Sequence, residues 1–397
     1  MPDIVCVIAG GEWQAPIISK IRENGYEVLC INLYSNTKGA KLADYFEQAD
    51  VTDKEACLLA AKKYDLKGIL TDQSDISVPT VAYIAEKMGL NGIGIECAAL
   101  FTNKLLMRHK AKSLGVHCPK FEIAHNSASV KNIVQKMRFP VVIKPIDSQS
   151  SRGVIVVKNI GDIDFAIAEA FSFTKVGNPI LIEEYIDGQE WTVEGFKQKD
   201  KHVSLAISFK QHLPLLPTVA SSINYVPIND SQLHRQLIEQ NDYLVNNMGL
   251  EFGITHAEYK YSNGNFYLIE VAARGGGANI SSHIIPIMSG VDANQMLLDQ
   301  VMEKEEVRFS RIPTGNFALL AFLNFDLGKV VSRTEESMVR GLPFVADFLY
   351  HFKIGDVIKK VVDDSSRHAQ VLIFAKSQHE LDENLHIIKE LVALTYE

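Results

Sequence analysis

The chain has 397 residues, of which 47% are apolar and 22% charged, values typical of a globular protein with two or three domains. Lys and Arg total 40 against 48 Asp and Glu, and the resulting net charge of −8 argues against a nucleic-acid-binding protein. The same composition excludes a disordered, collagen-like or disulfide-stapled chain, and no apolar run has the length of a membrane span.

The N-terminus runs directly into a strand pattern, without the basic and apolar segments of a signal peptide. The cysteines are odd in number, widely spaced and without a CxxC pair, so we expect buried free thiols in a reducing compartment. They are Cys6, Cys30, Cys57, Cys97 and Cys118. These features predict a cytoplasmic protein.

Strand and helix patterns alternate over residues 1–98, which predicts a doubly wound parallel sheet. Thr52 and Glu55 have the spacing of a capping box at the start of a helix. Gly10-Gly11 follows the first strand, but GxGxxG is absent, so a dinucleotide site is the weaker interpretation. The expected strands are 4–9, 26–31 and 68–71, and a helix over 78–88 ends at Gly89.

From about residue 99 the patterns favour an α+β region with mostly antiparallel pairing, and the remainder from 310 has three strand patterns and a terminal helix. We therefore expect three domains, 1–98, 99–309 and 310–397, the second with a subdomain at about 115–182. The expected helices of the second and third domains are 103–114, 162–172, 231–248 and 379–393.

Glu258 and Glu270 lie on the two arms of a hairpin. A two-residue Asn263-Gly264 turn would place the two carboxylates on opposite faces, whereas a three-residue loop ending at Asn265 pairs them directly. We expect the three-residue loop. It gathers one set of residues on one face (His256, Glu258, Lys260, Glu270 and Ala272) and another set on the opposite face (Ala257, Tyr259, Ile269 and Val271).

Two carboxylates that face each other repel unless a cation lies between them, and oxygen ligands suit Mg²⁺ bound together with phosphates. The alternative is a pair of acids on a solvated strand face. Arg274 and the glycines Gly275–Gly277 follow at once and supply a cation and bare backbone N–H groups, which favours a site.

Two other patterns precede the hairpin. Lys144 ends an apolar strand before the Ser-rich loop 147–153, which suits phosphate binding or, alternatively, a surface turn with a lysine reaching solvent. Glu183 and Glu184 end another apolar strand and Glu190 follows. These acids either reach solvent, or they read an adenine edge and ribose hydroxyls.

Taken in this order, the patterns resemble the ATP-grasp superfamily, whose members join a carboxylate to an amine through an acyl-phosphate. The resemblance covers nearly the whole chain. It implies an α/β and α+β multidomain protein with an ATP-grasp fold, a Rossmann-like pre-grasp domain and a small C-terminal α+β segment. The Glu-x-x-x-Arg-Gly-Gly-Gly form resembles the branch of amino-acid ligases and phosphoribosylglycinamide-synthetase-like enzymes.

The resemblance assigns ATP to a set of matched residues. Lys104 and Lys144 would contact the phosphates, and the 147–153 loop would be the lid. The lid would bind through Ser150, Ser151 and Gly153; Glu183 with the backbone of Glu184 and Ile186 would hold adenine, and Glu190 the ribose.

Glu258 and Glu270 would bind Mg²⁺ (or Mn²⁺), and Arg274 with Lys144 would be catalytic, stabilising the acyl-phosphate together with the glycine loop. Four other residues are candidates for substrate contact: His256, Gly276, Asn279 and Ser281. Asn279 and Ser281, with Ser282 and His283, could line a small polar pocket, or else they form a capped loop before the helix near 290. Lys210 and His212 are further candidates.

Two departures from the family pattern bear on activity: serines replace most lid glycines, and Ala272 stands where the family often has Asn. The expected function is ATP-dependent ligation of a small carboxylate, of amino-acid type, to an amine. The alternatives are a bicarbonate-using carboxylase or purine-pathway ligase of the same superfamily, and a catalytically degraded nucleotide-binding regulator. Expected partners are small molecules and a second copy in a homodimer, with no nucleic acid or membrane.

Overall fold

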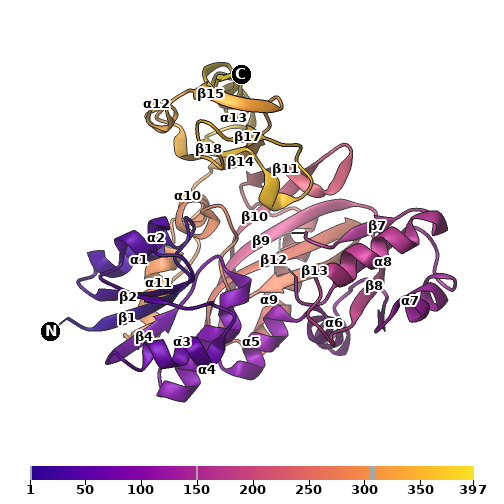
Figure 1. The fold of residues 1–397 in the computed structure, drawn as a ribbon, viewed down its shortest axis with the longest axis horizontal. Helices are drawn as coiled ribbons and strands as arrows, with labels where there is room; N and C mark the ends of the chain where they lie inside the picture. The colour runs from indigo at the N-terminus through magenta and orange to yellow at the C-terminus, as the bar shows by residue number, and fades with distance from the viewer. Residues whose placement is uncertain (1, 149–150, 305–308) are drawn as a thin grey trace.

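The structure, a computed structural model, describes residues 2–148, 151–304 and 309–397. Figure 1 shows the N-terminal region (indigo and violet) at one side of a central body and the C-terminal region (yellow) projecting from another side. The strands of the described ranges form sheets of four, eight, three and four strands.

The N-terminal region contains the predicted parallel sheet, with strand order β3-β2-β1-β4. The cap of the helix that starts at Lys54 differs from the expectation. Asp53, rather than Thr52, is the N-terminal cap, and its side chain accepts a hydrogen bond from Ala56 N at 3.0 Å. The strands are β1 Ile4–Ile8, β2 Glu27–Asn32, β3 Tyr45–Gln48 and β4 Leu66–Leu70. The helices are α1 Ala15–Glu23, α2 Lys38–Leu42, α3 Lys54–Ala61 and α4 Val78–Met88.

A second small sheet, with order β5-β8-β6-β7, is antiparallel and lies within the expected lid subdomain. Helices α5 Ile95–Thr102 and α6 Lys104–Ser113 lead into it. Its elements are β5 Phe121–Ala124, α7 Ser127–Val134, β6 Val141–Pro145, β7 Ile155–Val157, α8 Ile163–Ser172 and β8 Ile180–Glu184. Apolar side chains of α7 and α8 pack on one face of this sheet, and Val142, Lys144 and Val156 line the cavity described below.

The largest sheet is antiparallel throughout and has the order β13-β12-β9-β10-β11-β14-β18-β16, which confirms the expected antiparallel pairing. It continues across the domain boundary expected near residue 310, and the division into three domains remains a prediction. Its strands are β9 Gln189–Gln198, β10 Lys201–Leu213, β11 Leu216–Val226, β12 Phe252–Ser262, β13 Asn265–Ala272, β14 Phe317–Leu323, β16 Val345–Tyr350 and β18 Ala369–Ala375.

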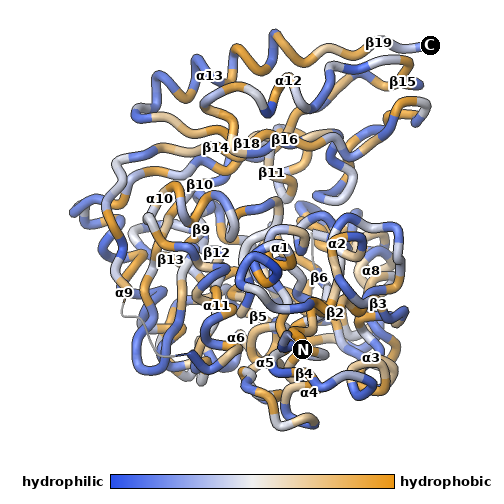
Figure 2. Tube along the Cα trace, turned by 90° about the vertical axis from the view of Figure 1, so that its left-hand side faces the viewer, coloured by the Kyte–Doolittle hydropathy of each residue, from blue (hydrophilic) through white to orange (hydrophobic). Residues whose placement is uncertain are grey.

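Helices cover the apolar face of this sheet. Amphipathic α9 packs on a core that includes Tyr259, Phe266 and Leu268, so the alternate residues of β12 face away from that core. In Figure 2, α13 alternates between blue and orange, and Leu381 and Ile388 on its apolar side pack against β18. The remaining elements are α9 Gln232–Asn246, α10 Ile285–Ser289, α11 Ala293–Val301, β15 Gly328–Arg333, α12 Glu336–Arg340, β17 Val357–Ile358, α13 Gln378–Leu391 and β19 Leu394–Tyr396.

The β12–β13 hairpin corrects one expectation and confirms another. The turn has two residues, Asn263 and Gly264, both with positive φ, and it pairs Ser262 with Asn265, so the expected three-residue loop was wrong. Glu258 nevertheless pairs with Glu270, as expected, because the register shifts between Tyr259 and Glu258.

The register shift is a β-bulge at Ile269, the residue that the pairing skips. Because of the bulge, Ile269 lies on the same side as Glu270 and lines the cavity described below, which corrects its expected place on the apolar face. The buried Arg108 donates through Nη2 to the carbonyl of Ile269 at 2.7 Å, so a helix from another part of the chain satisfies the backbone group that the bulge exposes.

All five cysteines are free thiols, and four of them are buried. Among the described residues, none of the helices combines the length and the hydropathy needed to span a membrane.

Candidate functional site

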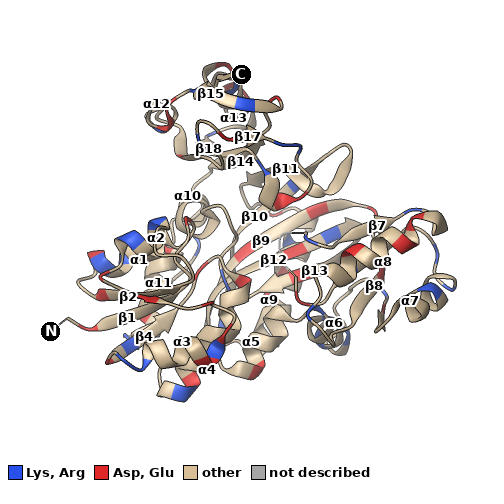
Figure 3. Ribbon diagram, in the orientation of Figure 1, with Lys and Arg blue, Asp and Glu red and all other residues tan. Residues whose placement is uncertain are grey.

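A cavity of about 590 Å³ lies where the three regions of the chain meet, and it contains most of the residues that the sequence singled out. The central sheet and the small sheet supply most of the lining. The N-terminal region adds Trp13, Gln73 and Asp75, and the C-terminal region adds His351, Asp364, Arg367 and Gln370. Acidic and basic positions occur together on the central strands that border the cavity (Figure 3).

The paired carboxylates lie on the cavity wall, and each has a lysine beside it. Lys210 Nζ is 2.6 Å from Glu258 Oε1, and Lys104 Nζ is 2.9 Å from Glu270 Oε1. Burial alone would raise the pKa of Glu258, but Lys210 and His256 outweigh it and hold this pKa well below the ordinary range. Both carboxylates are therefore placed to bind a cation.

His256 links Glu258 to an acid that the sequence analysis missed. Its Nδ1 is 2.8 Å and 3.0 Å from the two oxygens of the fully buried Glu194, and its Nε2 is 3.3 Å from Glu258 Oε1. Tyr225 donates to Glu194 at 3.0 Å. Although burial opposes it, Glu194 raises the pKa of His256 to about 9. The alternation along β9 could have indicated Glu194, since it pairs directly with His256 in the sheet.

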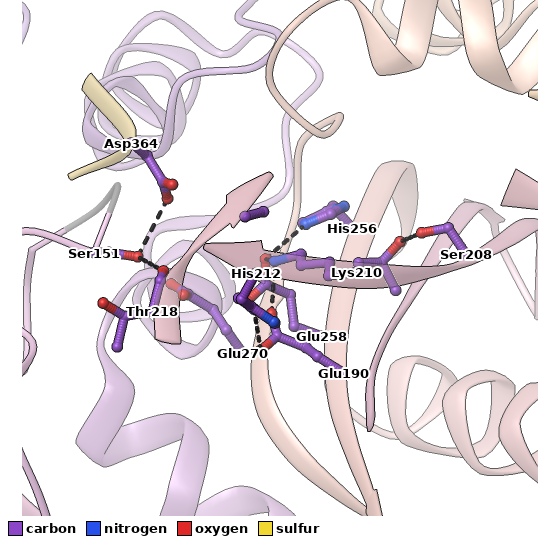
Figure 4. Close-up of polar contacts among 12 residues, drawn as sticks. Ser151, Glu190, Ser208, Lys210, His212, Thr218, His256, Glu258, Glu270 and Asp364 are labelled. Atoms are coloured by element: carbon purple, nitrogen blue, oxygen red, sulfur yellow. Dashed lines mark hydrogen bonds and ion pairs between the residues drawn. The ribbon is translucent and has the colours of Figure 1, made fainter. Parts of the chain in front are cut away.

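Glu190 lies among cations on neighbouring strands, as Figure 4 shows for Lys210 and His212. Lys210 Nζ is 2.8 Å from Glu190 Oε1, Lys260 Nζ is 3.1 Å from Oε2, and His212 Nε2 is 3.4 Å from Oε2. Burial would raise its pKa, but Lys210 and the other cations hold the pKa of Glu190 well below its usual value. Lys210 therefore bridges the predicted ribose and metal carboxylates.

Lys144 points into the cavity beside a buried carboxylate that it shares with an arginine. Lys144 Nζ is 2.6 Å from Glu183 Oε2, and Arg108 Nε donates to Glu183 Oε1 at 2.6 Å. The Glu183 carboxylate is thus engaged on both oxygens, which does not support its expected direct contact with adenine. Glu184 and Ile186 line the cavity. Burial lowers the pKa of Lys144, in spite of Glu183.

Arg108 was not singled out from the sequence, and a lone arginine in a basic helix carries no signal of this role. It is fully buried, and its Nη1 has no hydrogen-bond partner among the described residues. The pair of cations around Glu183 leaves an excess of positive charge on this side of the cavity.

Within the described residues, the 147–153 lid loop contributes fewer side chains to the cavity than expected. Ser148 accepts a hydrogen bond from Lys104 Nζ through its carbonyl at 2.7 Å, and Ser151 Oγ is 3.2 Å from Asp364 Oδ2. Ser150 lies outside the described residues. Gly153 is absent from the cavity lining, and its φ of +71° explains why glycine stands there.

Arg274 lies in the cavity and is held by an N-terminal carboxylate. Its Nε and Nη2 donate to the two oxygens of Asp75 at 2.8 Å and 2.5 Å, a bidentate contact. The buried Asp72 accepts from Gly275 N at 3.0 Å and from Ser281 Oγ at 2.5 Å, and burial raises the pKa of Asp72. The N-terminal region therefore anchors the start of the glycine loop.

The four substrate candidates divide between the cavity and the layer beneath it. His256 lines the cavity, whereas Gly276, Asn279 and Ser281 are not among the residues that line it, and their contact with substrate stays a prediction. Gly276 packs so closely that a Cβ would lie 3.0 Å from His256 Nδ1. Asn279 donates to Asp347 at 2.7 Å and is buried. Asn279 makes no side-chain cap hydrogen bond to the short helix that follows, so the capped-loop alternative is not supported either.

The C-terminal wall of the cavity was not predicted from the sequence. Arg367 pairs with Asp364 at 2.5 Å, and its guanidinium lies 3.5 Å from the centre of the Phe322 ring. Trp13 and His351 meet edge to face with ring centroids 6.0 Å apart, which joins the first and last regions across the cavity. Isolated residues so far apart in the chain give no local pattern.

The central part of the chain matches a known protein family. Residues 137–282 match the ATP-grasp domain. The chain is 27% identical over 184 residues to the formate-dependent phosphoribosylglycinamide formyltransferase of Methanocaldococcus jannaschii, covering 46% of this chain and 47% of that protein. It is 26% identical over 252 residues to the alanine–anticapsin ligase of Bacillus subtilis, covering 58% and 53%. The chain thus spans about half the length of these curated relatives.

The fold agreement extends over the full length. The L-amino acid ligase of Bacillus licheniformis superposes with a TM-score of 0.86 and 18% identity, covering 100% of this chain and 99% of that one. The phosphoribosylglycinamide synthetase of Anaerococcus prevotii superposes with a TM-score of 0.77 and 16% identity, covering all of both chains. Residues 137–282 thus match the ATP-grasp domain, and the whole chain shares the fold of these two solved structures.

Proposed function

We propose that the protein is an ATP-dependent carbon–nitrogen ligase that activates a small carboxylate as an acyl-phosphate and transfers the acyl group to an amine, releasing ADP and phosphate. The observation that carries the proposal is the register pair Glu258–Glu270, which lines the same cavity as Lys104, Lys144 and Arg274. Cations for a polyphosphate and carboxylates for a metal ion are thereby present at one place.

The distribution of charge around the cavity supports a set of proposed nucleotide contacts. Lys144 and Lys104 are buried ammonium groups at the side of the cavity where cations outnumber acids, which suits a phosphate chain. We assign Glu183 to the orientation of Lys144 and the backbone of Glu184 and Ile186 to the adenine edge. Glu190, on the next strand, is the candidate for the ribose hydroxyls.

The chemistry of the donor set fits Mg²⁺ (or Mn²⁺). Glu258 and Glu270 offer two carboxylates on adjacent strands, and no group of three or more metal-binding side chains occurs within the described ranges. Magnesium bound with phosphates typically takes one or two carboxylates and keeps several waters, so two acids suffice. When bound, the ion would neutralise charge on the transferred phosphoryl group.

The remaining chemistry is positioning and charge stabilisation. Arg274 is pre-oriented by Asp75, and the backbone of Gly275–Gly277 follows it, so both can stabilise negative charge on the acyl-phosphate and on the tetrahedral species after it. His256, held by Glu194, presents Nε2 on the same wall. A side-chain nucleophile is not required, because the enzyme brings acid, ATP and amine together.

The names of two related proteins support a small-molecule substrate of amino-acid type. One sequence relative is named an alanine–anticapsin ligase, and one structural neighbour an L-amino acid ligase. We infer that the acid is an amino acid or a similar small carboxylate, that the amine is likewise small, and that the enzyme works in the cytoplasm as a homodimer. The phosphoribosylglycinamide enzymes among the comparisons favour a purine-pathway ligase as the second candidate.

The test is an ADP-release screen over pairs of amino acids and small acids, with bicarbonate, formate and phosphoribosylamines as separate arms. Amine-dependent ADP release is expected, and Glu270→Gln should reduce it by about 100-fold or more, a few kcal/mol of charge stabilisation. The matched control is Glu239→Gln on the exposed side of α9, which should retain wild-type turnover.

Each outcome selects a function. Turnover only with bicarbonate, formate or a phosphoribosylamine would favour the second candidate over amino-acid ligation. ATP binding without turnover in every arm would identify a nucleotide-binding regulator, and unchanged turnover in Glu270→Gln would refute the proposed site.

A further inference from the structure

Each of the two acids proposed to bind a divalent cation already has a lysine as its counter-ion. Lys210 Nζ lies 2.6 Å from Glu258 Oε1, and Lys104 Nζ lies 2.9 Å from Glu270 Oε1. The two lysines come from β10 and α6, elements outside the hairpin that carries the acids. Two separate elements thus deliver one ammonium group to each carboxylate, as Figure 4 shows for Lys210 and Glu258.

Both lysines are held in place by a second contact. Lys210 Nζ also lies 2.8 Å from Glu190 Oε1, and Lys104 Nζ donates to the carbonyl of Ser148 at 2.7 Å. The Lys104 side chain is 8% exposed and that of Lys210 is 12% exposed, so neither ammonium group can swing into bulk water without leaving its partners. An ammonium that loses its carboxylate here keeps one partner but remains largely desolvated.

A divalent cation that enters alone therefore meets two fixed ammonium groups. To bind, the cation must displace the two lysines from the carboxylate oxygens. The two ammonium charges then remain close to the charge of the cation, in a cavity where charges are weakly screened. A polyphosphate that enters with the cation changes this balance, because its oxygens can accept the released ammonium groups.

We propose that Lys210 and Lys104 are internal counter-ions of the metal carboxylates, which exclude a divalent cation from the free protein and admit it only together with nucleotide phosphates. The proposal rests on the proposed function for the identity of the two ligands. It adds that affinities for metal and nucleotide are coupled through these two lysines. The coupling is reciprocal, since each ligand must strengthen the other by the same factor.

The experiment measures Mn²⁺ binding to the full chain by the loss of the free-ion electron paramagnetic resonance signal, without and with saturating ADP. For the wild type, ADP should tighten Mn²⁺ binding by about tenfold or more, the range of typical coupling between sites. For Lys210→Met, Mn²⁺ alone should bind about tenfold more tightly than to the wild type, because its competitor for Glu258 is gone. The effect of ADP on Mn²⁺ should shrink accordingly.

The matched control is Lys260→Met, which removes the same charge from the same cavity. Lys260 pairs with Glu190 at 3.1 Å and has no contact with Glu258 or Glu270 among those that the structure gives for it. Its loss should therefore tighten Mn²⁺ binding by no more than about threefold, the effect of net charge alone. Lys104→Met tests the second acid, and thermal unfolding of each variant shows that it is folded.

The outcomes separate this inference from the proposed function. If Lys210→Met and Lys104→Met bind Mn²⁺ no more tightly than the wild type, or if Lys260→Met gains as much, the counter-ion role is overturned. The nucleotide-free arm decides this even if ADP does not bind. Failure of ADP to bind the wild type would instead overturn the proposed function. Should Lys210→Met fail to fold, Lys210→Gln is measured in the same way.

Discussion

The two sides of the cavity each contain a buried lysine, but in opposite electrostatic settings. On the small-sheet side, Lys144 shares the single carboxylate of Glu183 with Arg108, and burial lowers its pKa. On the large-sheet side, Lys210 lies between two carboxylates, and although burial opposes it, Glu190 and Glu258 raise its pKa. One side has a surplus of cations and suits an anion, whereas the other has acids that suit a cation.

The difference arises from strand register rather than from composition. On the large sheet, alternate residues of β9 and β12 face the cavity, so His256 pairs with Glu194, and Lys260 pairs with Glu190. On the small sheet, strand β6 brings Lys144 to a carboxylate of β8, while α6 adds Arg108 from behind. A buried lysine can therefore belong to a site that suits an anion or to a site that suits a cation, depending on its neighbours.

The largest effect is expected where the shared carboxylate is removed. Glu183→Gln leaves Arg108 and Lys144 buried without a counter-ion, which should cost about 3 to 5 kcal/mol of unfolding free energy. Urea denaturation measures this loss, with Glu122→Gln on the exposed side of the adjacent strand β5 as control. A loss below about 1 kcal/mol, the value of a surface pair, would contradict the description of this side as a buried charge cluster.

The next effect is a pH dependence on the large-sheet side. The pKa of His256 is raised from its ordinary value of 6.5 to about 9 by Glu194, against the effect of burial. The pair therefore stabilises the fold fully below pH 6.5, by up to roughly 3 kcal/mol, and this contribution disappears as pH rises through 9. The difference in unfolding free energy between wild type and His256→Gln should shrink over that window, and a constant difference would exclude the pairing.

A smaller effect is expected at the arginine that lies between the two sides. Asp75→Asn keeps the shape but removes the charge that orients Arg274, so kcat for ADP release should fall by about tenfold while KM for ATP changes little. Arg22→Lys on the exposed part of α1 is a surface control. An increase in KM for ATP without a change in kcat would instead place Asp75 and Arg274 at the nucleotide.

The smallest effect is expected at the turn that sets the hairpin register. Gly264 has a φ of +80°, so Gly264→Ala should cost about 1 kcal/mol, whereas Gly161→Ala, with ordinary φ and open space, should cost less. Thermal unfolding of both variants measures the difference. Equal losses would mean that the turn does not constrain the pairing of Glu258 with Glu270.

The sequence by itself determined many of the helices and strands and the principal polar residues of the cavity. Hydrophobic periodicity located β1, β2 and β4 of the parallel sheet and the hairpin arms, since burial imposes a period on the chain. It missed β3, a short edge strand whose side chains are not buried. The order of Lys144, Glu190, Glu258 and Glu270 along the chain then indicated an ATP-grasp domain, which the family match over residues 137–282 confirms. Their individual roles remain predictions.

Only the tertiary structure decided which charges neutralise one another. The bulge at Ile269 has no sequence pattern of its own, yet it determines that Glu258 pairs with Glu270 across a two-residue turn. Arg108, Glu194 and Asp75 lie far along the chain from the residues they hold. Such partners are chosen by packing between elements, and local periodicity contains no information about contacts between distant segments.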